Sequence, residues 1–129
     1  MTGRRILIAF SLWIASMRAV LGGEQVPPGW EEVGAIFAAR CINCHSALGA
    51  AKGLRLDSYA AVLAGSADGA VVLPGDPAGS ELIRRLRGES TPRMPFLSTP
   101  LPKGEIDLIV RWIEAGAPEK GLAEADMAD

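Results

Sequence analysis

The sequence is poor in the residues from which metal and redox sites are built. Its 129 residues include two cysteines and one histidine. A structural zinc site uses four Cys or His ligands, so the chain lacks the ligands for one. Aromatic residues make up 5% of the chain, and no apolar run reaches the roughly 20 residues of a membrane-spanning helix. The length suits a single small domain, in which a large bound group would form a major part of the core.

The chain also has no excess of positive charge. Its formal net charge is −2, and residues 1–22 carry three arginines and no acidic residue. The remainder of the chain is therefore more acidic than the whole. An acidic domain has little electrostatic attraction for phosphates, so we expect no nucleic-acid partner.

Residues 1–23 have the features of a signal peptide. Arg4 and Arg5 form a basic start, residues 6–17 are apolar, and small residues follow. About twelve helical residues reach only ~18 Å, short of the ~30 Å hydrocarbon core of a bilayer. We therefore expect general secretion, cleavage and a periplasmic protein, in preference to twin-arginine export. The alternative is an uncleaved segment, which would attach the protein to the membrane.

Residues 41–45, Cys-Ile-Asn-Cys-His, follow the pattern used to attach haem covalently. Each thiol adds to one vinyl group of the porphyrin, and the adjacent His supplies the proximal nitrogen to the iron. A thioredoxin-like redox site would need a βαβ setting, of which the sequence has no sign. A structural disulfide is the alternative in an exported protein, but it leaves the His unexplained. We predict one haem c bound through Cys41 and Cys44, with His45 as an iron ligand.

The sixth ligand of the iron is expected to be Met94. The chain has no second His, Met1 and Met17 belong to the signal peptide, and Met127 lies beyond the last expected helix. Met94 lies among four prolines within residues 89–102, which predict a stiff, extended loop. The minor alternatives are Lys52 and Lys103.

The choice of axial ligands indicates the function. Iron held by His45 and Met94 is closed to substrates, which suits electron transfer and raises the reduction potential. The second ring nitrogen of His45 should donate to a backbone carbonyl, which orients the ring; Pro74 is the candidate. The alternatives are a sensor or peroxidase-like domain with a dissociable sixth ligand, and a disulfide-bonded binding domain without haem.

Helix signals occur before and after the attachment motif. Apolar residues recur at helical spacing from Trp30 to the motif, and Phe37 is expected in the core. Short helices bounded by capping residues follow, and the last helix is expected to have an apolar stripe. The expected later helices run from Tyr59 to Ala64, between Ser80 and Gly88, and from Pro102 to about Ala115.

These features together resemble the class I c-type cytochromes. Gly34 to Phe37 forms a Gly-x-x-aromatic element before the motif, and Leu108 to Ala117 resembles the helix that crosses it, close to Gly34. The segments 53–57, 74–77 and 93–95 are similar to planctomycete-type cytochrome c domains, although Phe96 stands where relatives often have Pro or Gly. The resemblance implies an all-α, small class I cytochrome c fold of short helices wrapped around one covalent haem.

The resemblance also implies an activity and a domain organisation. It indicates a periplasmic carrier of single electrons rather than an enzyme. Its partners would be a dehydrogenase, an oxidase or another cytochrome, with the chain acting as a monomer or as the haem c subunit of a complex. Arg84, Arg85, Arg87 and Arg93 form either a solvated basic face or a docking surface for an acidic partner. The expected parts are a signal peptide at 1–23, a short leader at 24–29, a cytochrome c domain at 30–118 and a disordered acidic tail at 119–129.

Overall fold

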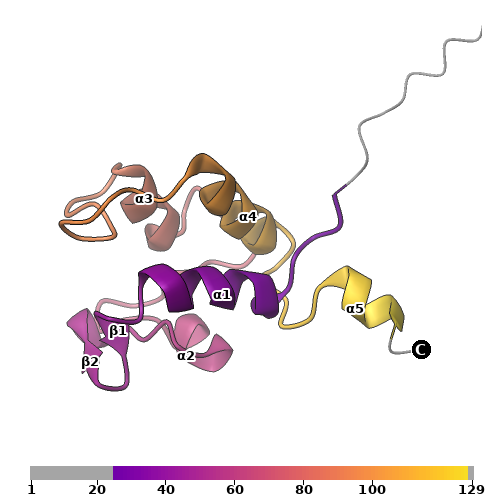
Figure 1. Ribbon diagram of the computed structural model, residues 1–129, viewed down its shortest axis with the longest axis horizontal. Helices are drawn as coiled ribbons and strands as arrows, with labels where there is room; N and C mark the ends of the chain where they lie inside the picture. Colours follow the sequence, from indigo (N-terminus) through magenta and orange to yellow (C-terminus); the bar gives the residue numbers. More distant parts are fainter. Residues whose placement is uncertain (1–24, 128–129) are drawn as a thin grey trace, which may run out of the picture.

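Short helices joined by loops form most of the chain (Figure 1). The computed structural model describes residues 25–127, so the signal peptide expected at 1–23 lies outside the described residues. A two-stranded antiparallel hairpin directly after the attachment motif is the departure from the expected all-α fold. The elements are α1 (Trp30–Arg40), β1 (His45–Ser46), β2 (Gly49–Ala50), the 3-10 turn η1 (Ala51–Gly53), α2 (Tyr59–Ala64), α3 (Glu81–Arg87), α4 (Lys103–Glu114) and α5 (Leu122–Met127).

The first two helices follow the sequence signals. In α1, Val33 and Phe37 are fully buried, as the apolar spacing predicts. Helix α2 has Ser58 as its N-cap, whose hydroxyl oxygen accepts a hydrogen bond from the amide of Ala61 at 3.3 Å. Gly65 ends α2 with a positive φ of 80°, a conformation that glycine adopts without steric cost.

Ser80 is the N-cap residue of α3, as expected, but its side chain makes no capping hydrogen bond. The Ser80 hydroxyl donates to the carbonyl of Asp76 and accepts from the amide of Leu73, each at 2.8 Å. Ser80 is fully buried, so its side chain satisfies the preceding turn rather than the helix end. Gly88 ends α3 in the left-handed conformation, as expected.

Helix α4 lies across α1, with α2 and the hairpin on the other side of α1 (Figure 1). It also contacts α3. It begins one residue later than expected, with Pro102 as its N-cap. Its apolar stripe is buried, which places the core between α1, α3 and α4. The buried residues of α4 are Ile106, Ile109, Trp112 and Ile113.

Four aromatic rings join three helices. The Trp30 ring centroid lies 5.8 Å from Phe37, 6.0 Å from Tyr59 and 6.2 Å from Trp112, within the range of favourable aromatic contacts. Gly34 leaves room for this cluster, because a Cβ atom there would lie 2.9 Å from the Trp30 indole. The closest approach to such a Cβ atom is therefore made by a side chain of the same helix.

The leader and the tail lie at one end of the molecule, opposite the hairpin (Figure 1). The Trp30 amide donates to the Glu119 carbonyl at 2.9 Å, which joins the two segments. The tail expected to be disordered instead contains α5 at Leu122–Met127, a run of residues with good intrinsic helix propensity. Among residues 25–127, no helix has the length and apolar character needed to cross a bilayer.

Candidate haem-binding site

The attachment motif forms a tight turn at the end of α1. The Cys41 amide donates to the Phe37 carbonyl at 2.8 Å and so ends the helix. The amides of Cys44 and His45 then donate back to the Cys41 carbonyl at 3.2 and 3.1 Å. Cys41 and Cys44 are both free thiols, the first half-buried and the second exposed. The turn therefore places Cys41, Cys44 and His45 within one hydrogen-bonded segment of backbone.

His45 is buried and oriented by a backbone carbonyl. Its Nδ1 lies 3.1 Å from the Leu54 carbonyl oxygen. Because a carbonyl can only accept, Nδ1 carries the proton and Nε2 remains as the metal-binding nitrogen. The acceptor is therefore Leu54 and not Pro74, because the chain turns back through the hairpin and η1 to place Leu54 beside the ring. The Leu56 amide donates to the His45 carbonyl at 2.8 Å and fixes this return segment.

The two attachment thiols have different electrostatic surroundings. Burial and, to a smaller extent, the nearby Glu105 carboxylate raise the pKa of the Cys41 thiol to about 11, against the opposing charge of Arg40. Arg40 and Glu105 form an ion pair of 3.6 Å between α1 and α4. In the folded chain Cys41 is therefore a protonated thiol at neutral pH, and the thiolate is the nucleophilic form.

Met94 lies in the loop between α3 and α4, which contains no helix, as expected. Its side chain is half-buried and packs against the core. Its amide donates to the Arg85 carbonyl at 3.0 Å, so the loop is attached to α3 at the candidate ligand itself. Elimination of other ligands predicts Met94 as an iron ligand from the sequence, but the sequence contains no signal for this contact with Arg85.

The two lysines that could replace Met94 are engaged elsewhere. Lys52 lies 3.7 Å from Asp68 and its side chain is 76% exposed. Lys103 pairs with Asp107 one helical turn along α4, and its side chain is 88% exposed. Solvation and a carboxylate partner both disfavour transfer of such an ammonium group to a buried iron site.

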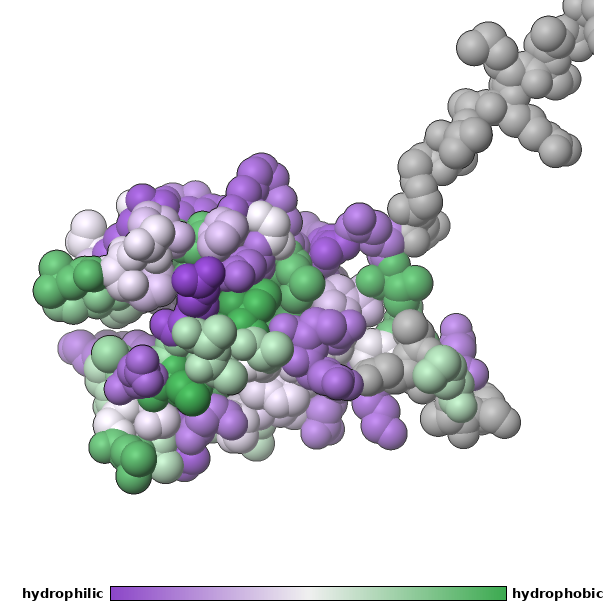
Figure 2. Space-filling view, in the orientation of Figure 1, coloured by the Kyte–Doolittle hydropathy of each residue, from purple (hydrophilic) through white to green (hydrophobic). Residues whose placement is uncertain are grey.

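The Met94 loop and the β1–β2 hairpin lie at the same end of the molecule (Figure 1). Figure 2 shows a notch in the surface between these two segments, with apolar residues on both sides. Leu48 of the hairpin and Phe96 and Leu97 of the loop are exposed large apolar side chains. An apolar cleft between the two segments is the environment that a haem group requires.

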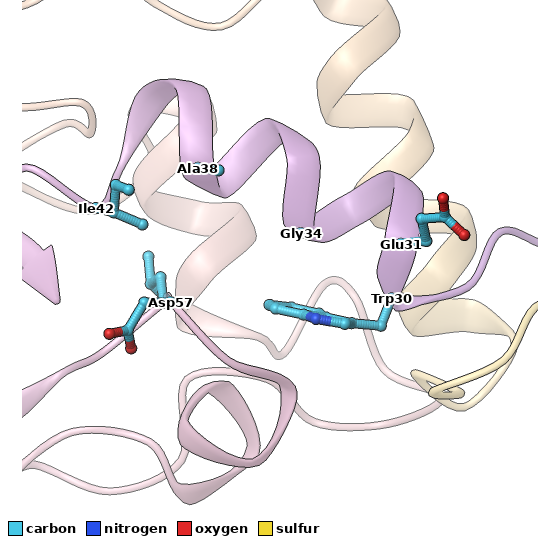
Figure 3. Close-up of a pocket in the computed structure, with 7 residues that line it drawn as sticks. Trp30, Glu31, Gly34, Ala38, Ile42 and Asp57 are labelled. Atoms are coloured by element: carbon cyan, nitrogen blue, oxygen red, sulfur yellow. The ribbon is translucent and has the colours of Figure 1, made fainter. Parts of the chain in front are cut away.

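A second hollow lies along α1 and reaches Ile42 of the attachment motif (Figure 3). Its volume is about 190 Å³, below the roughly 300–1,000 Å³ of typical small-molecule sites. The residues that would bind the haem or its iron do not line it: Cys41, Cys44, His45 and Met94. We assign no ligand to this hollow. It is lined by Trp30, Glu31, Gly34, Ala38, Ile42, Leu56 and Asp57.

The residues at the motif fit a covalently bound haem. Two unpaired thiols and an imidazole with Nε2 available are the donors that attachment and proximal ligation require. Within residues 25–127, no group of three or more His, Cys, Asp or Glu side chains is placed to bind a metal ion. A metal cluster built from these side chains is therefore no competitor for the motif in the described part of the chain.

Comparison with known proteins agrees with this reading of the motif. Residues 41–95 match the family model described as planctomycete cytochrome C, which confirms the resemblance drawn from the sequence. The match begins at Cys41 and ends at Pro95, so it includes the motif and Met94. No curated protein and no solved structure matches the chain significantly.

Proposed function

Because residues 41–95 match the family model described as planctomycete cytochrome C, we propose that this protein transfers single electrons through one covalently bound haem. Cytochrome c domains generally act as electron carriers. Cys41 and Cys44 would hold the haem through thioether bonds, and His45 and Met94 would be its axial ligands. The single observation that carries the proposal is the hydrogen bond from His45 Nδ1 to the Leu54 carbonyl, which leaves Nε2 available as a ligand in a motif whose two cysteines are free thiols.

The haem supplies the iron that changes oxidation state, and the chain supplies its environment. The Leu54 carbonyl keeps the His45 ring in one orientation, and a fixed ring requires little rearrangement during electron transfer. Met94, as a thioether ligand, would close the iron and raise its reduction potential. The exposed apolar side chains of Phe96 and Leu97 on the Met94 loop would help to exclude water from the haem and leave an edge for a partner to approach.

We place the protein outside the cytoplasm, in the periplasm, with residues 1–23 as the export signal. This rests on the basic and apolar pattern of those residues and on the need for haem attachment after export. The exposed arginines of α3 and the Met94 loop would face an acidic redox partner such as a dehydrogenase, an oxidase or another cytochrome. The protein would act as a free monomer or as a subunit of such a complex.

The first test is the iron ligation of protein made in cells that attach haem. Covalent attachment predicts a coloured protein whose mass includes one haem. The ferric wild type should show the weak red absorption band of methionine-bound iron, and Met94→Ala should lose it. Met127→Ala is the matched control, because Met127 lies in α5 at the opposite end of the molecule, and it should retain the band.

The same protein distinguishes the alternative functions. Reduced wild type should bind carbon monoxide slowly and weakly, and Met94→Ala should bind it readily. A wild type that lacks the red band and binds carbon monoxide readily would be a sensor or peroxidase-like domain. A colourless protein without the mass increase would contradict haem attachment altogether.

A further inference from the structure

Helix α3 is joined to the Met94 loop by several hydrogen bonds. The Met94 amide donates to the Arg85 carbonyl at 3.0 Å, and Arg85 Nη1 donates to the Pro92 carbonyl at 3.3 Å. The amides of Glu89 and Ser90 donate to the Arg84 carbonyl of α3 at 2.8 and 3.2 Å. Arg85 therefore contacts the loop through both its main chain and its side chain, and one of these contacts is to Met94 itself.

Glu81 connects the guanidinium of Arg85 to a second point of the loop. Its Oε1 accepts a hydrogen bond from Arg85 Nε at 2.6 Å. Its Oε2 accepts from the Ser90 hydroxyl at 3.2 Å and pairs with Arg84 Nη2 at 2.7 Å. One carboxylate thus binds two cations of α3 and one hydroxyl of the loop.

This carboxylate is ionised and partly shielded from water. The hydrogen bond from Arg85 lowers the pKa of Glu81 below its usual value, against a smaller effect of burial. The side chains of Glu81 and Arg85 are 28% and 31% exposed, less than those of a fully solvated surface pair. Solvent screening is therefore incomplete, and a charge-assisted hydrogen bond keeps part of its strength.

We infer that Glu81 and Arg85 are positioning residues that hold Met94 in place for the iron. The inference rests on the proposed ligation by His45 and Met94. A ligand held by its own backbone and by neighbouring loop residues loses less conformational freedom when it binds. Without the Glu81 charge, Arg85 and Ser90 would move more freely, and Met94 would be displaced more easily from the iron.

The test is the displacement of Met94 by imidazole in the ferric holoprotein. Glu81→Gln keeps the shape of the side chain and removes its charge. We expect imidazole to bind about threefold to tenfold more tightly to this variant, since the energy of a partly exposed charged pair is of this order. Ser90→Ala, which leaves both ion pairs in place, should give a smaller shift in the same direction.

Asp107→Asn is the matched control. It breaks the Lys103–Asp107 pair, which has the same i,i+4 spacing but joins two residues of α4. Imidazole affinity should stay within about twofold of wild type in this variant. Hydrogen exchange at the Met94 amide of the holoprotein should become faster in Glu81→Gln and remain unchanged in Asp107→Asn, because that amide reports the loop contact directly.

The outcomes separate this inference from the proposed function. If the wild type shows the red band but Glu81→Gln changes neither imidazole affinity nor Met94 amide exchange, the inference is wrong and the ligation by Met94 stands. If the wild type lacks the red band, the proposed ligation fails and the inference fails with it. Equal changes in Glu81→Gln and Asp107→Asn would reduce Glu81 to a general stabilising residue and overturn its positioning role.

Discussion

The two attachment cysteines differ in burial although they lie three residues apart. Cys41 is half-buried at the end of α1, where burial and Glu105 raise its thiol pKa to about 11. Cys44 is exposed. Because the thiolate is the reactive form, the thiolate fraction of Cys41 falls about tenfold for each pH unit below its pKa. Folding therefore makes Cys41 the less reactive of the two thiols.

Alkylation of the folded, haem-free chain tests this difference. At pH 8, iodoacetamide should label Cys44 at least about tenfold faster than Cys41, because Cys41 is both shielded and protonated. The rate at Cys41 should keep rising as the pH increases towards about 11. Peptide mass spectrometry measures both rates.

Denaturing urea provides the control for this prediction. It removes the burial of Cys41, and the two rates should then become similar. Equal rates in the folded chain at pH 8 would contradict the raised pKa.

Single residues of the site were predictable where the signal is local. The Cys-x-x-Cys-His spacing lies within five residues, so both thiols and His45 can be proposed as haem-binding residues without knowledge of the fold. The acceptor of His45 Nδ1 was not predictable. Leu54 is nine residues away and reaches the ring only after the chain has turned through the hairpin and η1, so its role depends on tertiary structure.

Two glycines at helix ends differ in whether the structure requires glycine at that position. Gly65 ends α2 with a φ of 80°, and a Cβ atom there would lie 2.5 Å from the Gly69 carbonyl oxygen. Gly104 lies near the start of α4 in open space, with nothing within 4 Å of such an atom. The first glycine is required by conformation and contact, and the second by neither.

Alanine substitution should therefore act in opposite directions. Gly65→Ala should lower the free energy of unfolding by about 1–3 kcal/mol, because it combines a strained φ with a clash against backbone. Gly104→Ala should raise it by up to about 1 kcal/mol through helix propensity. Urea denaturation of the two holoproteins checks both, and each variant serves as the control for the other. A stable Gly65→Ala would mean that the Gly69 turn can move away.

The helices begin and end close to the residues that the sequence predicts, but some residues at helix ends make other hydrogen bonds than predicted. Ser58 and Gly65 act within α2, as their local spacing predicts. Ser80 has the same capping chemistry, yet its hydroxyl binds Asp76 and Leu73 instead. A capping residue has several backbone partners within reach, and the packing around it selects among them.

The charge distribution of the whole molecule is less basic around α3 than the sequence suggests. Glu81 pairs with both Arg84 and Arg85, so these arginines contribute little free positive charge. Arg87 and Arg93 are exposed and take part in no ion pair among residues 25–127. The docking surface that we propose for an acidic partner therefore consists mainly of these two.

Charge reversal tests this surface. Arg87→Glu and Arg93→Glu should each slow electron transfer with an acidic redox partner by about threefold to tenfold at low ionic strength, since complementary charge speeds association. The difference from wild type should vanish at high salt, where the charges are screened. Stopped-flow kinetics across a salt series measures the effect.

Lys120→Glu is the matched control for charge reversal. Lys120 is exposed beside α5, at the end opposite the Met94 loop (Figure 1). The Lys120→Glu substitution changes the net charge by the same amount as each arginine substitution. It should leave the salt dependence of electron transfer close to that of wild type. Equal effects of all three variants would show that net charge matters, and would contradict a localised docking surface.

By itself, the sequence determined the Cys-x-x-Cys-His pattern, the bounds of most helices and the proposal of Met94 as a ligand, because each depends on a few neighbouring residues or on the scarcity of other ligands. Tertiary structure alone decided which carbonyl orients His45, which side chain occupies the space at Gly34, and how Arg85 and Glu81 attach the Met94 loop to α3. These contacts depend on tertiary packing, so local sequence patterns do not predict them. Only the folding of the return segment onto His45 and of the Met94 loop onto α3 brings their donors within reach of the acceptors.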